Sequence, residues 1–171
     1  ADAVVVEHGL IRHGHPIAKR LYHMARRQSL PTGSLIDDLL GRHHLIASDL
    51  PPLITLLSLD TGLEIECVKT LEIDCLRNPS AGTVELAYLK RRAGRAAYKT
   101  MRIRDGGIGT PGGLIRRLIE VTAAARRHMP SQCLWVYHNQ GRFHASIGHP
   151  RETIDAWTRH HATGDDDGGP P

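Results

Sequence analysis

The chain is poor in aromatic residues, which make up 4% of its 171 positions: one Phe, two Trp and four Tyr. Proteins that read single-stranded RNA stack its bases on aromatic side chains arranged along strands. The sequence contains no such aromatic pattern. A single-strand reader of this kind is therefore not indicated.

Long apolar runs and paired cysteine motifs are also missing. A membrane span needs roughly 18 consecutive apolar residues, and the start Ala-Asp-Ala-Val-Val-Val lacks the basic flank of a signal peptide. The sequence therefore predicts a cytoplasmic protein with no membrane partner. An odd number of cysteines without CxxC spacing argues against a disulfide framework or a zinc knuckle and predicts reduced core thiols: Cys67, Cys75 and Cys133.

Histidine is abundant, with 12 residues, but its spacing does not indicate a metal centre. Zinc-binding pairs on a helix stand four residues apart with an acid between them. The close pairs in this chain lack that spacing: His13/His15, His43/His44 and His160/His161. The sequence predicts no metal site.

Composition predicts one folded domain with appendages, because 40% hydrophobic and 23% charged residues are ordinary for a globular chain. Residues 1–44 are expected to be a helical linker or the end of a preceding domain, and residues 45–162 the domain itself. Residues 163–171, rich in Gly, Asp and Pro, are expected to be a disordered tail. We expect the chain to be a fragment or a truncated product.

Apolar residues recur at helical spacing in several segments. They predict amphipathic helices over residues 15–29 and 34–40 and a very apolar, centrally buried helix that follows Ser48-Asp49. A break at Thr61-Gly62 precedes a further helix that runs to about Glu72, and Thr110-Pro111 begins a helix that reaches Arg127.

Two stretches rich in β-formers, residues 83–90 and 98–104, predict antiparallel strands. Residues 77–82 read as a turn, residues 133–137 as a further strand and residues 151–161 as a short helix. The expected fold class is α+β, mainly helical, with a small antiparallel sheet.

Positive charge is concentrated in the predicted hairpin. Residues 84–104 hold seven cations and one anion, a net charge of +6, whereas the whole chain carries only +4. Arginine grips phosphates with two hydrogen bonds, and concentrated positive charge releases the counterions of DNA. We therefore predict that duplex DNA is bound by these residues and the next helix: Arg91, Arg92, Arg95, Lys99, Arg102, Arg104, Arg116 and Arg117.

The run Leu-x-Leu-x-Thr-Gly-Leu at residues 57–63, followed by a helix, a short strand and a lysine-bearing hairpin, resembles the tyrosine recombinase (phage integrase) family. The resemblance covers about residues 45–128, the amino-terminal half of that family's catalytic domain. It implies a DNA breaking-rejoining core of helices with a small antiparallel sheet, so residues 45–162 would be a partial integrase-like catalytic domain. It also implies double-stranded DNA and other recombinase subunits as partners, and no cofactor.

In that family a tyrosine hydroxyl attacks a phosphodiester, arginines bind the phosphate oxygens and a hairpin lysine protonates the leaving oxygen. The resemblance places Lys90 at the lysine position, with Lys99 as the alternative, and Glu64 at the position of the first arginine. A carboxylate repels phosphate, and losing one transition-state donor costs about 3 kcal/mol, roughly a hundredfold in rate. Either the charge is supplied elsewhere or this chain cannot cleave.

The family's later motifs are missing, because no His-x-x-Arg box and no suitably placed tyrosine follow the helix that begins at Pro111. Tyr137 lies in an apolar run and is expected to be a core residue, as is Trp157. The sequence therefore predicts a truncated, integrase-like DNA-binding protein of recombination or DNA integration. Such a protein is not competent for strand cleavage alone. The sequence leaves open whether the chain is an enzyme.

Two other hypotheses remain. The chain could be a non-enzymatic interaction or regulatory module whose basic hairpin binds RNA or protein. Alternatively it could be an incomplete product, in which the helix from Pro111 to Arg127 lacks its packing partners and leaves apolar surface exposed.

Overall fold

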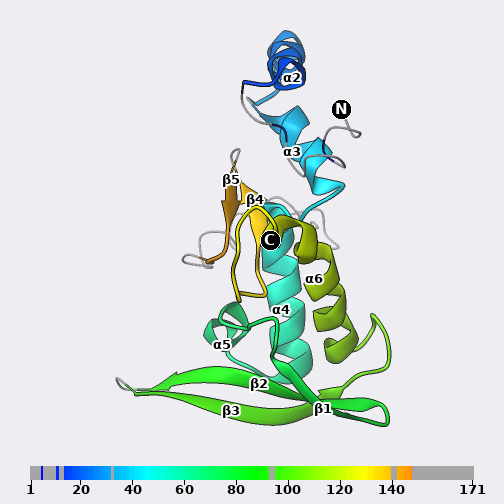
Figure 1. The fold of residues 1–171 in the computed structure, drawn as a ribbon, viewed down its shortest axis with the longest axis vertical. Coiled ribbons are helices and arrows are strands. Elements are labelled where there is room, and N and C mark those ends of the chain that lie inside the picture. The colour runs from blue at the N-terminus through cyan, green and yellow to red at the C-terminus, as the bar shows by residue number, and fades with distance from the viewer. Residues whose placement is uncertain are drawn as a thin grey trace, which may run out of the picture.

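A computed structural model describes residues 5, 11, 14–31, 33–92, 95–139 and 142–147 of the chain. Its fold is α+β, with helices and a small antiparallel sheet, as the sequence predicts (Figure 1). The elements follow in the order α2 (Pro16–Arg27), α3 (Ser34–Gly41), the 3₁₀ turn η1 (Ala47–Asp49), α4 (Leu50–Thr61), α5 (Ile65–Lys69), β1 (Leu76–Ser80), β2 (Thr83–Arg92), β3 (Arg95–Arg104), α6 (Pro111–Arg126), β4 (Tyr137–Asn139) and β5 (Arg142–His144).

Helices α2 and α3 form a hydrophobic cluster separate from the main core. Helix α2 begins at Pro16, where a missing amide donor costs little, and the His15 Nδ1 atom accepts a hydrogen bond from the Ile17 amide at 3.2 Å. Both predicted helices are confirmed. The buried members of this N-terminal cluster are Val5, Ile11, Ala18, Ile36, Leu39 and Leu40.

Helix α4 begins and ends where the sequence predicts. Pro51 and Pro52 lie in its first turn, and Gly62 ends it with a φ of 70°, a left-handed conformation that glycine adopts without steric cost. The expectation of a centrally buried helix is correct for one side of α4 and wrong for the other. Leu56 and Leu59 are 46% and 77% exposed, because no element in the described part of the chain covers that side of α4.

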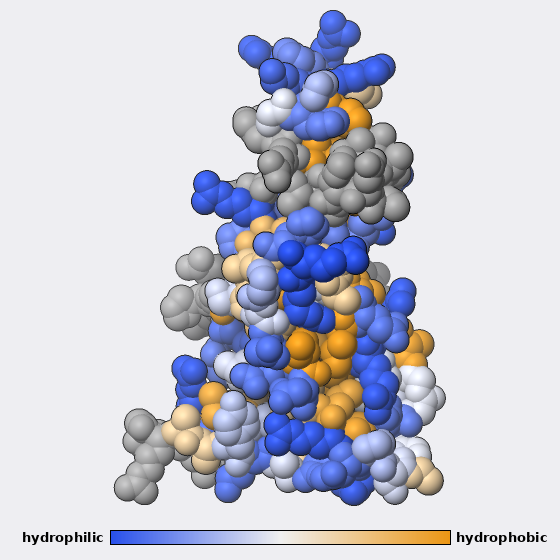
Figure 2. All heavy atoms as spheres, viewed as in Figure 1, coloured by the Kyte–Doolittle hydropathy of each residue, from blue (hydrophilic) through white to orange (hydrophobic). Residues whose placement is uncertain are grey.

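Apolar side chains gather on the face that Figure 2 presents, over the region where α4 and α6 lie side by side in Figure 1. The opposite side of α4 is fully packed: Ile54 and Leu57 are at most 1% exposed and belong to the main core. Helix α4 therefore has one apolar side packed in the main core and another apolar side that is exposed.

The segment after α4 is less helical than its apolar spacing predicts. Helix α5 ends at Lys69 rather than near Glu72. The Leu134 amide donates to the Leu71 carbonyl at 2.8 Å, and the Ile73 amide donates to the Gln132 carbonyl at 2.9 Å. These extended pairings withdraw residues 71–73 from the helix, and β4 begins only at residue 137, later than predicted.

The main sheet has the order β1-β2-β3, with both pairs antiparallel. The predicted strands are confirmed, but residues 77–80 belong to β1 and not to a turn. Pro79 is compatible with β1 because this strand lies at the edge of the sheet and pairs only with β2. The turn shrinks to residues 81–82, where Gly82 has a φ of 68°.

Helix α6 confirms the prediction of a helix that begins at Thr110-Pro111. The Thr110 hydroxyl accepts from the Gly113 amide at 3.3 Å and donates to the Gly107 carbonyl at 2.7 Å. A Cβ atom on Gly113 would collide with the Gly107 backbone, so this close approach requires glycine. The loop between β3 and α6 is thereby held against the first turn of α6.

Trp135 connects α5 to the main core. Its side chain is fully buried, and its indole Nε1 donates to the Val68 carbonyl at 2.8 Å. Val68 is itself fully buried on α5. The β4–β5 pair, which the sequence does not predict, follows directly after this segment.

Other expectations are tested only in part. Cys67 and Cys75 are buried free thiols, as predicted, and Cys133 is half-buried. No helix in the described part of the chain combines the length and apolar character needed to cross a membrane. The predicted helix over residues 151–161, with Trp157, and the tail from residue 163 lie outside the described residues.

Replacing Trp135 by Phe should lower the free energy of unfolding by about 2 kcal/mol, since a buried hydrogen bond and part of a packed ring are lost. Urea denaturation followed by circular dichroism measures this. The control is Leu59→Ala, which should change the free energy by no more than about 0.5 kcal/mol because the side chain is exposed. Equal effects of the two substitutions would contradict this role of Trp135.

Candidate nucleic-acid interface

Strands β2 and β3 form a ribbon, here called the basic hairpin, that extends beyond the helices. All ten residues of β2 pair with β3, from Thr83 opposite Arg104 to Arg92 opposite Arg95. Figure 1 shows the near end of this ribbon beneath α4 and α6 and its far end projecting past α5. The far part of the hairpin is therefore accessible from both faces.

Side chains alternate between the two faces of the ribbon. On the helix-facing side, Val84 and Leu86 of β2 and Ile103 of β3 are buried in the main core. Continuing outward, that same side carries Lys90 on β2 and Lys99 on β3. The buried residues of the core thus determine on which face of the ribbon each cation of the hairpin lies.

The opposite, open face carries the hairpin arginines whose side chains the structure describes: Arg91, Arg102 and Arg104. Arg91 and Arg104 are exposed there and make no ion pair among the described residues. Tyr98 lies between them and is 62% exposed. The backbones of Arg92 and Arg95 pair at the end of the hairpin, but their side chains lie outside the part that the structure describes.

Arg102 belongs to a polar network at the near end of the open face. Its Nη1 atom donates to the Thr83 hydroxyl at 3.3 Å, and Glu85 lies opposite it in the strand register. Hydrogen bonds from Asn78, at 2.6 Å, and then Thr100 hold the pKa of the Glu85 carboxyl below its usual range. Arg102 is therefore oriented and partly neutralised by its neighbours.

Lys90 is paired with Glu64. The Lys90 Nζ and Glu64 Oε1 atoms are 3.2 Å apart, with side chains 24% and 65% exposed. Glu64 immediately precedes α5, and Lys90 lies where β2 leaves the core. The two residues that the resemblance assigns to the phosphate site thus lie together, but their charges cancel.

The two arginines of α6 that the sequence assigns to DNA binding, Arg116 and Arg117, differ from the free cations of the basic hairpin because each is paired with an acid. Arg116 makes a two-pronged contact with Asp105, with its Nη2 and Oδ2 atoms 2.7 Å apart, and this hydrogen bond lowers the pKa of Asp105. Arg117 pairs with Glu120 at 3.2 Å. Sequence reasoning counted both as free, since it could not locate these partners.

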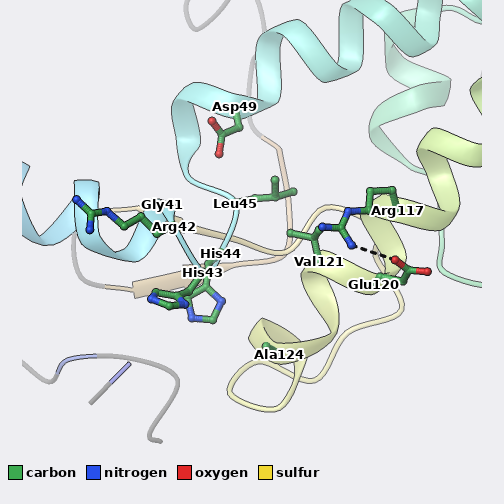
Figure 3. Close-up of a pocket in the computed structure, with 10 residues that line it drawn as sticks. All are labelled: Gly41, Arg42, His43, His44, Leu45, Asp49, Arg117, Glu120, Val121 and Ala124. Carbon is green, nitrogen blue, oxygen red and sulfur yellow. Dashed lines mark hydrogen bonds and ion pairs between the residues drawn. The ribbon is translucent and has the colours of Figure 1, made fainter. Parts of the chain in front are cut away.

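Arg117 and Glu120 also line an open pocket of about 430 Å³ between α6 and the segment after α3 (Figure 3). Several of its polar groups already have partners within the chain. The Arg117–Glu120 pair closes one side, and the Asp49 carboxylate accepts from the Ile46 amide at 2.9 Å. The pocket is therefore a weaker candidate than the hairpin. Its remaining lining residues are Gly41, Arg42, His43, His44, Leu45, Val121 and Ala124.

A histidine cluster lies beside this pocket, at the junction between the N-terminal cluster and the main core. His44 and His138 are 4% and 3% exposed, and Phe143 packs edge-on against both rings. No three metal-binding side chains come together in the described ranges. The cluster is a packing feature that sequence reasoning missed, because its members are far apart in the chain.

No family model, no curated protein and no solved structure matches this chain.

Protonation of His138 should weaken the junction. Burial, followed by the charges of His44 and His144, lowers its pKa from 6.5 to about 4. The Asp37 carboxylate, 3.5 Å away, opposes this shift but is 41% exposed, so burial prevails. As the pH falls, the folded form binds a proton on His138 at a lower pH than the unfolded form does. The neutral imidazole therefore contributes fully to the free energy of unfolding above pH 6.5, and this contribution is lost as the pH falls towards 4.

The expected loss is roughly 3 kcal/mol by pH 4. An NMR titration of the His138 imidazole gives its pKa, and the pH dependence of unfolding is compared with that of His138→Gln, which cannot titrate. A His138 pKa near 6.5, or the same pH dependence in both proteins, would show the prediction to be wrong.

Proposed function

We propose that this chain binds double-stranded DNA through the basic hairpin, as an integrase-like protein of recombination or DNA integration, and does not cleave strands by itself. The observation that carries the proposal is a projecting two-stranded ribbon with unpaired cations on both faces. Arg91 and Arg104 occupy one face, and Lys99 the other. No ligand class fits such a ribbon better than a grooved polyanion.

The dimensions of duplex DNA suit this shape. The major groove is about 12 Å wide and admits a two-stranded β-ribbon. Phosphates line both walls of the groove, and in the proposed orientation the ribbon enters with one face towards each wall. Cations on both faces then neutralise phosphates and release counterions, which makes affinity depend steeply on salt.

The order of elements supports the family resemblance. An apolar helix, the corner at Gly62, a second short helix, an antiparallel sheet and the capped helix α6 follow one another as the resemblance implies. Lys90 and Glu64 lie 3.2 Å apart, as expected for two positions that would face one phosphate. These features support a recombinase-like core in residues 45–128.

The environment of the tyrosines supports the absence of cleavage. Tyr137 is 9% exposed, its hydroxyl donates to the Ser146 carbonyl at 3.3 Å, and burial raises its pKa. Tyr98 is exposed, but it points to the face opposite Lys90. Neither of these two hydroxyls is placed beside the Glu64–Lys90 pair, where the resemblance would locate the phosphate. Tyr88 shares the helix-facing side of β2 with Lys90, but it is only partly exposed and packs against the main core.

Arg104→Gln should reduce the slope of log affinity against log salt by about 0.9, the loss of one phosphate contact. Fluorescence anisotropy with a short labelled duplex, from about 50 to about 200 mM salt, measures the slope. Arg117→Gln removes the same charge from an ion pair and should leave the slope unchanged. Binding that is absent or insensitive to salt would instead favour a protein-binding module.

A nicked suicide DNA substrate tests the absence of cleavage. It traps a 3′-phosphotyrosyl link whenever a tyrosine has attacked, so denaturing gel electrophoresis should show free protein only. A covalent adduct, mapped to a tyrosine by mass spectrometry, would contradict this part of the proposal.

A further inference from the structure

Lys90 differs from the other described cations in the far part of the hairpin. Lys99 and Arg91 make no ion pair among the described residues, whereas the Lys90 ammonium contacts the Glu64 carboxylate at 3.2 Å. The acid comes from another element, 26 positions earlier in the chain. A lysine on a DNA-binding ribbon is thus supplied with an anion by the protein itself.

The Lys90–Glu64 ion pair contributes little to the stability of the fold. Glu64 is 65% exposed and makes no capping hydrogen bond to α5, whereas Lys90 is only 24% exposed. An ion pair with one exposed partner contributes little to stability, about 0–1 kcal/mol. Glu64 can therefore be replaced at little cost to the fold, while the lysine stays in place.

The direction of Lys90 identifies the competing anion. It lies on the helix-facing side of β2, the side that also carries Lys99 across the ribbon, and not with Arg91 on the open face. When the ribbon enters a groove, this side faces the second wall of phosphates. The anion that would reach Lys90 is a phosphodiester of the bound duplex.

We infer that Lys90 is a phosphate-binding residue occupied by its own chain: the Glu64 carboxylate stands where a DNA phosphodiester would bind. Lys90 then adds to DNA affinity only when the Glu64 charge is removed. The inference rests on the proposed DNA binding by the hairpin. It makes Glu64 the residue that sets how many phosphates the ribbon engages.

The neighbouring Lys69–Glu66 pair provides a matched control. Its atoms are 2.9 Å apart, with side chains 10% and 72% exposed, so the acid again covers a less exposed lysine. Both partners belong to α5, and neither lies on the ribbon. Glu66→Gln therefore removes the same charge as Glu64→Gln without freeing a cation of the hairpin.

The test measures the salt slope of duplex binding for Glu64→Gln, Lys90→Gln, the double variant and Glu66→Gln. Glu64→Gln should steepen the slope by about 0.9, so that affinity falls roughly threefold to fourfold further than in wild type between about 50 and about 200 mM salt. Lys90→Gln alone should leave the slope unchanged. In the double variant the gain of Glu64→Gln should vanish, and Glu66→Gln should match wild type.

Two results would overturn the inference while leaving DNA binding intact: Glu64→Gln behaving like Glu66→Gln, or Lys90→Gln alone losing one phosphate contact. Failure of the proposed function has a different signature, in which wild type shows no salt-dependent binding and Arg104→Gln changes nothing; that outcome overturns both. Circular dichroism of each variant confirms that it is folded, which the exposure of Glu64 favours.

Discussion

The position of the Glu64–Lys90 pair depends on the buried hydrogen bond from the Trp135 indole to the Val68 carbonyl. Helix α5 has five residues, too few to be stable without tertiary contacts. Trp135 fixes it from one side, and the pairing of residues 71–73 with residues 132–134 fixes the segment that follows. Glu64 immediately precedes α5, so its position against Lys90 depends on an aromatic ring in a distant part of the chain.

The basic hairpin combines two environments in one pair of strands. Near the core, buried apolar side chains alternate with partly exposed polar ones, as in Val84 and Glu85. Further out the helices no longer cover it, and both faces carry cations. Because the period of two continues without a break along the paired strands, the core also decides that Lys90 and Arg91 point to opposite sides.

Local signals were sufficient for most helix ends and for the hairpin strands, though not for the end of α5. Thr110-Pro111 and Thr61-Gly62 act through their own backbone geometry, so the beginning of α6 and the end of α4 could be predicted. The edge strand β1 could not, because Asn-Pro-Ser at residues 78–80 has the composition of a turn and only its place at the sheet edge permits it. Among the candidate site residues, Lys90 and Glu64 were identified by resemblance, but their ion pair joins two elements and has no local signal.

During synthesis of the chain, the local pairing of the hairpin can form earlier than the long-range contact between Val68 and Trp135. The strands of the basic hairpin are nearly adjacent in sequence and can pair as soon as they emerge from the ribosome. Val68 and Trp135 are 67 positions apart, an interval of roughly 3 to 13 seconds at ordinary rates of synthesis. The hairpin is complete at Arg104, 31 positions before Trp135. For roughly 2 to 6 seconds of that interval, therefore, α5 is still unanchored and the nascent chain exposes its cationic ribbon before the core positions Glu64 against Lys90.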